Sequence, residues 1–299
     1  MKIHCIASRV LWGQIGRIEQ GFVELGHEIT SYIDDADLIY INNPPFTQAI
    51  KDKLSGKLKA IFIFNVLDIP KLHIPNYNVE ELKDQLLHAD AVTSISNFTK
   101  KCVNKYCNIE SEVIYNPINN IFPINSNFKQ YKYLFLGRCM DPNKRTSLAI
   151  EALNLLHVKE NEIIVVGPEP IGIGDYYGVC TEEMLNQIYN AVDFVFCLGK
   201  DEGLGLCSFE ALASSHCIPI VAQDMTTQME FFNNDDFVVL PTASHISNFI
   251  SSFQSQSDVR EFVNYFHLKY NGFIQKNLTD KAVAQKIINV YNNLTNKNY

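Results

Sequence analysis

One segment of the chain combines carboxylates with glycines at a strand-to-helix turn. Residues 201–210 read Asp-Glu-Gly-Leu-Gly-Leu-Cys-Ser-Phe-Glu; they follow an apolar run and open a helical stretch. Glycines let the backbone pass close to a ligand, and the first amides of a helix suit a phosphate group. Glu202 and Glu210 can face one ligand, and carboxylates accept hydrogen bonds from sugar and ribose hydroxyls. A tight turn before a capped helix explains the glycines equally well.

Short apolar runs alternate with amphipathic stretches along most of the chain, which is typical of parallel βαβ units. We expect strands at 2–7, 28–33, 37–42, 59–64, 90–95, 112–115, 133–136, 163–166, 193–198 and 217–222. We expect helices near 15–25, 46–55, 79–88, 97–106, 145–157, 182–192 and 206–215, and from Thr279. The Asn-rich segment 116–130 has no periodicity and contains two prolines, so it predicts an interdomain linker.

Composition excludes several classes of protein. The 299 residues carry a net charge of −8, which argues against electrostatic capture of nucleic acid. We find no signal peptide and no apolar run of about 18 residues, and the eight cysteines lie singly in apolar surroundings. These features predict a cytoplasmic protein with reduced core thiols.

The segment with Glu202 and Glu210, together with residues 181–185 and 189–193 before it, resembles the donor-binding region of glycosyltransferase family 4. The stretches 217–222 and 135–138, with 141–144 just after the latter, are similar to that family as well. In the first half the resemblance rests on 26–29, and on 89–96 followed by 115–118.

The resemblance implies an α/β GT-B fold, in which two Rossmann-like doubly wound parallel-sheet domains face each other across a cleft. Residues 1–120 would form the N-terminal, acceptor-side domain and residues 121–299 the nucleotide-sugar-binding domain. The last helix, about 279–295, would cross back and pack on the first domain. The implied activity is a retaining transfer of a hexose from a UDP- or GDP-sugar to an unidentified acceptor hydroxyl, on a glycan, a lipid-linked sugar or a protein.

The resemblance also assigns roles to individual residues. Arg138 and Lys144 would hold the diphosphate, Glu202 would bind hydroxyls of the donor sugar, and Glu210 would bind the ribose. The donor would further contact Val179, beside the base, and Gly13, in the loop after the first strand. The amides that complete the phosphate site belong to Gly203, Leu204, Gly205, Leu206 and Cys207. We expect no metal and no cofactor other than the nucleotide sugar.

Three departures from the family pattern bear on these roles. Arg138 and Lys144 are one position further apart than is usual, so Arg145 is an alternative to Lys144. The histidine of the family's loop after the fourth strand is missing, which leaves Asp68 as the candidate at the reacting centre. The first domain is also short.

Other functions stay open on the sequence. The protein can bind a sugar nucleotide through a GT-B fold without turnover, or it can be a GT-B DNA-base glucosyltransferase, although the acidic balance disfavours nucleic acid. Lipid acceptors are common in the family, and Lys100, Lys101 and Lys105 offer a weak basic face for peripheral membrane contact.

Overall fold

The computed structural model describes residues 1–7, 12–42, 47–67, 79–200, 202–234 and 236–296. The chain divides into two compact units, one of residues 1–117 with 275–299 and the other of residues 118–274. The sequence places this division near residue 120. No helix in the described part of the chain has the length and hydropathy needed to span a bilayer.

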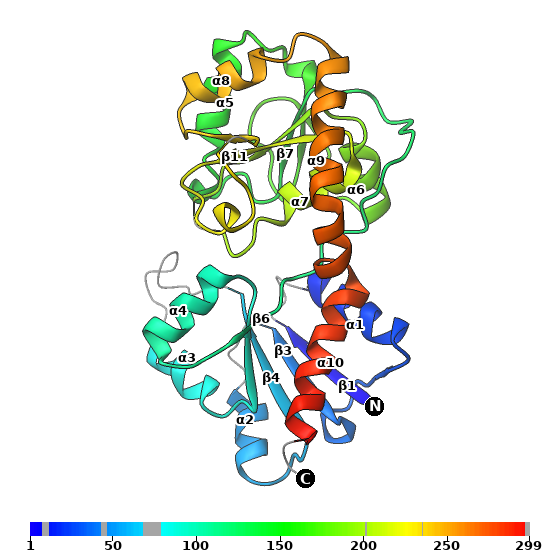
Figure 1. The fold of residues 1–299 in the computed structure, drawn as a ribbon, viewed down its shortest axis with the longest axis vertical. Helices are drawn as coiled ribbons and strands as arrows, with labels where there is room; N and C mark the ends of the chain where they lie inside the picture. Colours follow the sequence, from blue (N-terminus) through cyan, green and yellow to red (C-terminus); the bar gives the residue numbers. More distant parts are fainter. Residues whose placement is uncertain (8–11, 43–46, 68–78, 201, 235, 297–299) are drawn as a thin grey trace. The chain divides into compact units, whose positions relative to one another are not determined.

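The first unit is built on a six-stranded parallel sheet with the strand order β2-β1-β3-β4-β5-β6. Figure 1 labels β1, β3, β4 and β6 of this sheet. Its strands are β1 (Lys2–Ala7), β2 (Glu28–Ile29), β3 (Leu38–Asn42), β4 (Ile61–Val66), β5 (Ala91–Ser94) and β6 (Glu112–Val113). Its helices are α1 (Trp12–Glu24), α2 (Thr47–Leu54), α3 (Val79–Leu86), α4 (Asn97–Cys107) and α10 (Asp280–Asn296). Every residue of β3 is buried, as expected for a central parallel strand covered by helices on both faces.

The second unit repeats this architecture with the order β12-β11-β10-β7-β8-β9, and all of its strand pairs are parallel. The strands are β7 (Tyr133–Leu136), β8 (Ile163–Val166), β9 (Asp175–Tyr176), β10 (Phe194–Cys197), β11 (Ile218–Ala222) and β12 (Val238–Val239). The helices are α5 (Thr146–Leu155), α6 (Glu182–Tyr189), α7 (Leu206–Ser214), α8 (Ala243–Ser251) and most of α9 (Gln256–Asn277). The expected class, two doubly wound parallel-sheet domains, is therefore confirmed.

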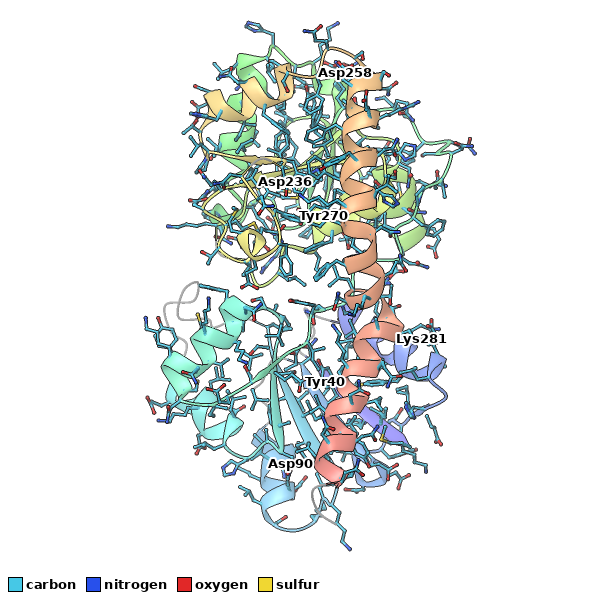
Figure 2. All side chains as sticks on the ribbon, viewed as in Figure 1. Tyr40, Asp90, Asp236, Asp258, Tyr270 and Lys281 are labelled. Atoms are coloured by element: carbon cyan, nitrogen blue, oxygen red, sulfur yellow. The ribbon has the colours of Figure 1, made fainter. Side chains whose placement is uncertain are left out.

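The last helix belongs to the first unit, as the fold class requires. The successive helices α9 and α10 carry the chain from the second unit into the first, and α10 packs on α1 (Figures 1 and 2). The helices α1 and α10 share one core with β1 and β3, in which Ile18, Phe22 and Ile287 are fully buried. An ion pair of 2.9 Å between Arg17 and Asp280 lies where α10 begins.

Candidate functional site

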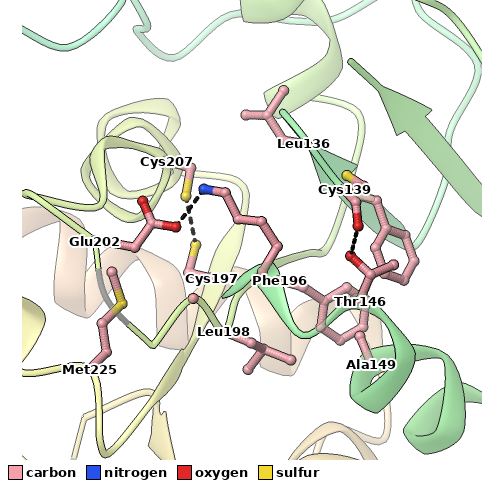
Figure 3. Close-up of a pocket in the computed structure, with 13 residues that line it drawn as sticks. Leu136, Cys139, Thr146, Ala149, Phe196, Cys197, Leu198, Glu202, Cys207 and Met225 are labelled. Atoms are coloured by element: carbon pink, nitrogen blue, oxygen red, sulfur yellow. Dashed lines mark hydrogen bonds and ion pairs between the residues drawn. The ribbon is translucent and has the colours of Figure 1, made fainter. Parts of the chain in front are cut away.

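The second unit has a pocket at the point where its strand order reverses. The chain enters the sheet at β7 and continues on one side with β8, while β10 lies on the other side. In doubly wound sheets, ligands bind outside the carboxyl ends of the strands at this point. The pocket is lined by the ends of β7 and β10, by the start of α7 and by residues that follow these strands (Figure 3). These residues are Phe135, Leu136, Cys139, Lys144, Thr146, Ala149, Phe196, Cys197, Leu198, Gly199, Glu202, Cys207 and Met225.

An ion pair between Lys144 and Glu202 lies in this pocket. The ammonium Nζ donates to Glu202 Oε1 over 2.5 Å, and the two side chains are 25% and 19% exposed. Burial alone lowers the pKa of Lys144, but the carboxylate of Glu202 and the nearby thiols of Cys207 and Cys197 raise it above its ordinary value. Lys144 therefore keeps a positive charge in a half-buried position, which suits an anionic ligand.

Gly199 makes room for this ion pair. A Cβ atom at this position would lie 2.3 Å from Glu202 Oε1, so a larger residue would displace the carboxylate. The position of the Glu202 carboxylate thus depends on a glycine outside the 201–210 segment.

The two other cations considered for the phosphates lie differently. Arg138 is 69% exposed, and its Nη2 is 4.0 Å from Asp141 Oδ2. Arg145 makes a bidentate pair with Asp224, with both N–O distances at 2.7 Å. Both cations pair with a carboxylate, but Lys144 lines the pocket and Arg145 does not, so the geometry favours Lys144 over Arg145.

The glycine loop before α7 is held by the segment that follows β11. Gln228 Nε2 donates to the carbonyl oxygens of Leu204 and Gly205, and Thr227 Oγ1 donates to the carbonyl of Glu202 over 2.9 Å. Ser208 Oγ donates to Gln228 Oε1 and, over 2.8 Å, to the carbonyl of Gly205. Gly205 has a left-handed φ of 71° and fits closely against Gln228, because a Cβ would come within 2.5 Å of its Nε2.

Sequence reasoning did not find Thr227 and Gln228. One signal was available: they follow the expected strand 217–222, and the carboxyl ends of neighbouring parallel strands meet at the same edge of the sheet.

Glu210 is buried within the second unit and has partners from two other segments. Its Oε1 accepts from the backbone N–H of Asn119 over 3.0 Å and from Asn119 Nδ2 over 2.7 Å. Its Oε2 accepts from the hydroxyl of Tyr189 over 2.8 Å. Glu202 lines the pocket, whereas Glu210, 3% exposed, holds residues of the linker and of α6 against α7. Its expected role at the ribose stays a prediction.

The remaining predicted residues lie elsewhere. Val179 is 81% exposed and lies between β9 and α6, in the loop where it was expected. The prediction that Gly13 lies in a loop after the first strand was wrong, because α1 begins at Trp12 and includes it. Asp68 lies outside the described residues. Leu204 is buried, and Leu206 and Cys207 are the first two residues of α7.

Among the residues that the structure describes, no group of three or more His, Cys, Asp or Glu side chains is arranged to hold a metal ion.

This chain is similar to known proteins in its structure. No protein-family model matches the sequence, and neither does any curated protein. HepE of Anabaena, in complex with UDP and glucose, is similar with a TM-score of 0.70 and 13% identity, over 98% of this chain and 100% of that one. A glycosyltransferase of Rickettsia africae is similar with a TM-score of 0.68 and 15% identity, over 98% of each chain.

A third similar structure is an alpha-glucosyltransferase in complex with UDP and a 13-mer DNA containing a HMU base. Its TM-score is 0.67 and its identity 14%, over 99% of each chain. The neighbours are GT-B glycosyltransferases, so the fold of this chain is GT-B.

Proposed function

We propose that the protein is a metal-independent glycosyltransferase that moves a hexose, with retention, from a UDP- or GDP-sugar to an acceptor hydroxyl, in the manner of family 4. The observation that carries the proposal is the Lys144–Glu202 pair, which lies in a pocket at the switch point of a GT-B sheet and next to the start of α7. A cation and a helix N-terminus at one place suit a diphosphate, and a carboxylate beside them suits sugar hydroxyls.

In the proposed site the residues have separate tasks. An ammonium group has three donors, so Lys144 can keep its bond to Glu202 and still donate to a phosphate oxygen. The amides of residues 203–207, with the positive end of the α7 dipole, add to the charge that the leaving diphosphate meets. Arg138, which is largely exposed, would turn to the same phosphates. The departing diphosphate takes the proton of the incoming hydroxyl on the same face of the sugar, so the protein contributes position and charge.

Donor binding by the full chain tests this proposal. We expect UDP- or GDP-glucose to raise the melting temperature, because a ligand at about 100 times its Kd stabilises the folded state by about 2.7 kcal/mol. Lys144→Ala should abolish the rise. Lys132→Ala is the matched control. Lys132 forms an ion pair with Glu162, with an N–O distance of 2.9 Å, and does not line the pocket. If the donor still raised the melting temperature of Lys144→Ala, the pocket would not be the donor site.

Slow hydrolysis of the donor without an acceptor separates an enzyme from a protein that only binds the nucleotide sugar. We expect release of the free sugar from the donor, and we expect it to persist in EDTA because the proposed phosphate ligands are all protein groups. Strict dependence on added Mg²⁺ or Mn²⁺ would contradict the proposed mechanism.

A DNA-base glucosyltransferase is a second candidate, and the DNA-bound neighbour, aligned over nearly the full length of both chains, favours it. The net charge of −8 weighs against it. Incubation of the donor with DNA containing a hydroxymethylated base, at low salt, decides between the two. A mass increase of one hexose on the DNA would make DNA the acceptor.

A further inference from the structure

Three of the eight cysteines line the candidate pocket, and two of them are in contact. Cys197 is the last residue of β10 and Cys207 is the second residue of α7. Their Sγ atoms are 3.2 Å apart (Figure 3). The third, Cys139, follows β7, and its backbone carbonyl accepts a hydrogen bond from Thr146.

The two thiols in contact have different surroundings. Cys207 is partly exposed and lies in the first turn of α7. Lys144 lines the same pocket and adds a positive charge. Cys197 is buried, and burial, followed by the neighbouring Cys207 thiol, raises its pKa well above the ordinary value. Cys207 is therefore the thiol that an oxidant reaches first, and Cys197 is the partner beside it.

We propose that Cys197 and Cys207 form an oxidation site in the donor pocket, which hydrogen peroxide converts reversibly into a disulfide. The Cys207 thiolate attacks one peroxide oxygen; the O–O bond breaks, the sulfur becomes a sulfenic acid and hydroxide leaves. The Cys197 sulfur then attacks the sulfenic sulfur, the S–O bond breaks, and the departing hydroxide takes the Cys197 proton to form water. Two thiols and one peroxide thus give one disulfide and two waters, with two electrons passing from sulfur to oxygen.

The disulfide would act on the loop that carries the proposed donor ligands. It joins residues 197 and 207, and Glu202 and the glycines 203 and 205 lie between them. Cys197 is fixed in the sheet through its pairing with Val221 of β11, so Cys207 must move to reach it, and the first turn of α7 moves with it. A small misplacement of positioning groups strongly reduces turnover. This consequence rests on the proposed function, whereas the chemistry of the dithiol does not.

Peptide mapping of the oxidised full chain tests the chemistry. The protein is treated with a small excess of hydrogen peroxide, the excess is removed, and remaining thiols are alkylated before digestion with trypsin. The relevant peptides, 160–200 and 201–260, also contain Cys180 and Cys217, so fragment ions must locate the link. We expect a Cys197–Cys207 link that disappears after dithiothreitol. We expect Cys139 to stay reduced during the oxidation, since burial raises the pKa of its thiol to about 11, and to be alkylated once the chain is denatured.

Two variants sharpen the test. Cys180→Ser is the matched control, because Cys180 is also partly exposed but lies before α6 and does not line the pocket. This variant should form the link as the wild type does. Cys197→Ser should leave the Cys207 sulfenic acid without a partner, so that dimedone labels residue 207. Equal oxidation of all thiols, or a dominant link from Cys207 to Cys139 or Cys217, would overturn the proposal.

Donor binding is then measured before and after oxidation. We expect the affinity of the wild type and of Cys180→Ser for UDP-glucose to fall about tenfold or more on oxidation and to recover with dithiothreitol, the scale of a lost positioning contact. If the link forms and the affinity stays unchanged, the proposed effect on the loop is wrong. If the reduced protein binds no nucleotide sugar at all, the proposed function fails, while the peptide map still decides on the dithiol.

Discussion

At the scale of single residues, the structure gives the two glutamates of the 202–210 segment different surroundings. Glu202 faces the pocket and pairs with Lys144, whereas Glu210 is buried against Asn119 and Tyr189. Their spacing suggested that both face one ligand. A carboxyl group with donors on both oxygens contributes to stability whether or not it binds a ribose, so a test of Glu210 must separate the two effects.

The comparison of Glu210→Ala with Tyr189→Phe makes this separation. Tyr189→Phe removes the hydroxyl that donates to Glu210 Oε2 and, over 3.4 Å, to the carbonyl of Cys207, and it keeps the carboxyl group. We therefore expect a loss of about 1 kcal/mol in the free energy of unfolding with donor affinity unchanged. Glu210→Ala leaves the buried donors without their acceptor and should cost about 1–3 kcal/mol in stability, with a loss of donor affinity of similar size. Urea unfolding and calorimetric titration with UDP-glucose measure the two quantities. An unchanged donor affinity in folded Glu210→Ala would exclude Glu210 from the ribose site.

Asp236 predicts a pH dependence of stability in the second unit. Burial alone raises the pKa of this carboxyl, but hydrogen bonds from Lys269, Tyr270 and the backbone N–H of Asn233 lower it below its ordinary value. A lowered pKa in the folded state means that the stabilisation is complete above the pKa of the unfolded chain, about 3.9, and is lost as the pH falls below it. We therefore expect Asp236→Asn to be less stable at neutral pH by about 1–3 kcal/mol.

The same variant should lose less stability than the wild type between about pH 4 and pH 2, because it lacks the group that titrates. Urea midpoints at several pH values measure the difference. If the stability of the two proteins fell by the same amount between about pH 4 and pH 2, Asp236 would not contribute to this pH dependence. Asp258→Asn is a useful comparison, since its carboxyl also has a lowered pKa but is exposed.

At the scale of elements, the contact between α1 and α10 depends on one glycine. A Cβ atom on Gly21 would lie 2.2 Å from the carbonyl oxygen of Asp280 and 2.9 Å from the Cβ of Ala284. The backbone of α10 therefore comes so close to α1 that no side chain fits between them.

Alanine at two positions of α1 should have opposite effects. Gly21→Ala forces the helices apart and should lower the free energy of unfolding by about 1–3 kcal/mol. Gly16→Ala, where an added Cβ meets nothing within 4 Å, should raise it by about 0.5–1 kcal/mol because glycine is a poor helix former. Urea unfolding of both variants measures the contrast. Equal effects of the two substitutions would show that the close contact is unimportant.

The order of strands and helices was largely predictable, because each buried parallel strand is a continuous apolar run. The helices α8 and α9 were both missed. In α9 the buried positions Val259, Val263, Phe266, Tyr270 and Ile274 do have helical spacing. Exposed Tyr265 and Leu268 blur that pattern. The two-residue strands β9 and β12 are too short for any periodicity to show.

The candidate site was predictable in part. The sequence indicated Lys144, Glu202 and Cys207, and the structure brings these three into one pocket. It did not indicate that Arg145 pairs with Asp224, or that Gln228 holds the loop before α7. Those contacts join residues 23 to 79 positions apart, so they depend on tertiary packing that local pattern does not contain.

At the scale of the whole molecule, the chain completes its first unit only with its last residues. The second unit is one continuous segment, 118–274, whereas the first consists of 1–117 together with 275–299. This division explains why α10 carries an apolar stripe: it fills the core over α1, as the resemblance to GT-B proteins led us to expect. The first unit should therefore depend on the C-terminal segment for its stability.

Truncation after residue 278 tests that dependence. It removes Val283 and Ile287, which are 1% and 0% exposed, together with Ala284 and Ile288, and it uncovers Ile18 and Phe22. Burial of each large side chain contributes about 1.5–3 kcal/mol, so the loss approaches the whole stability of a domain, about 5–15 kcal/mol. We expect the 1–278 chain to aggregate, or to keep only the unfolding transition of the second unit and to bind a hydrophobic dye.

A chain ending at residue 296 is the control, because it keeps the whole of α10 and should behave like the full protein. Ile287→Asp in the full chain gives the same test without a truncation, since it places a charge in the core shared by α1 and α10. It should destabilise the first unit and leave the second folded, so that two unfolding transitions separate in calorimetry. A soluble 1–278 chain with full transferase activity would refute the structural role of the last helix, because the first unit would then be complete without it.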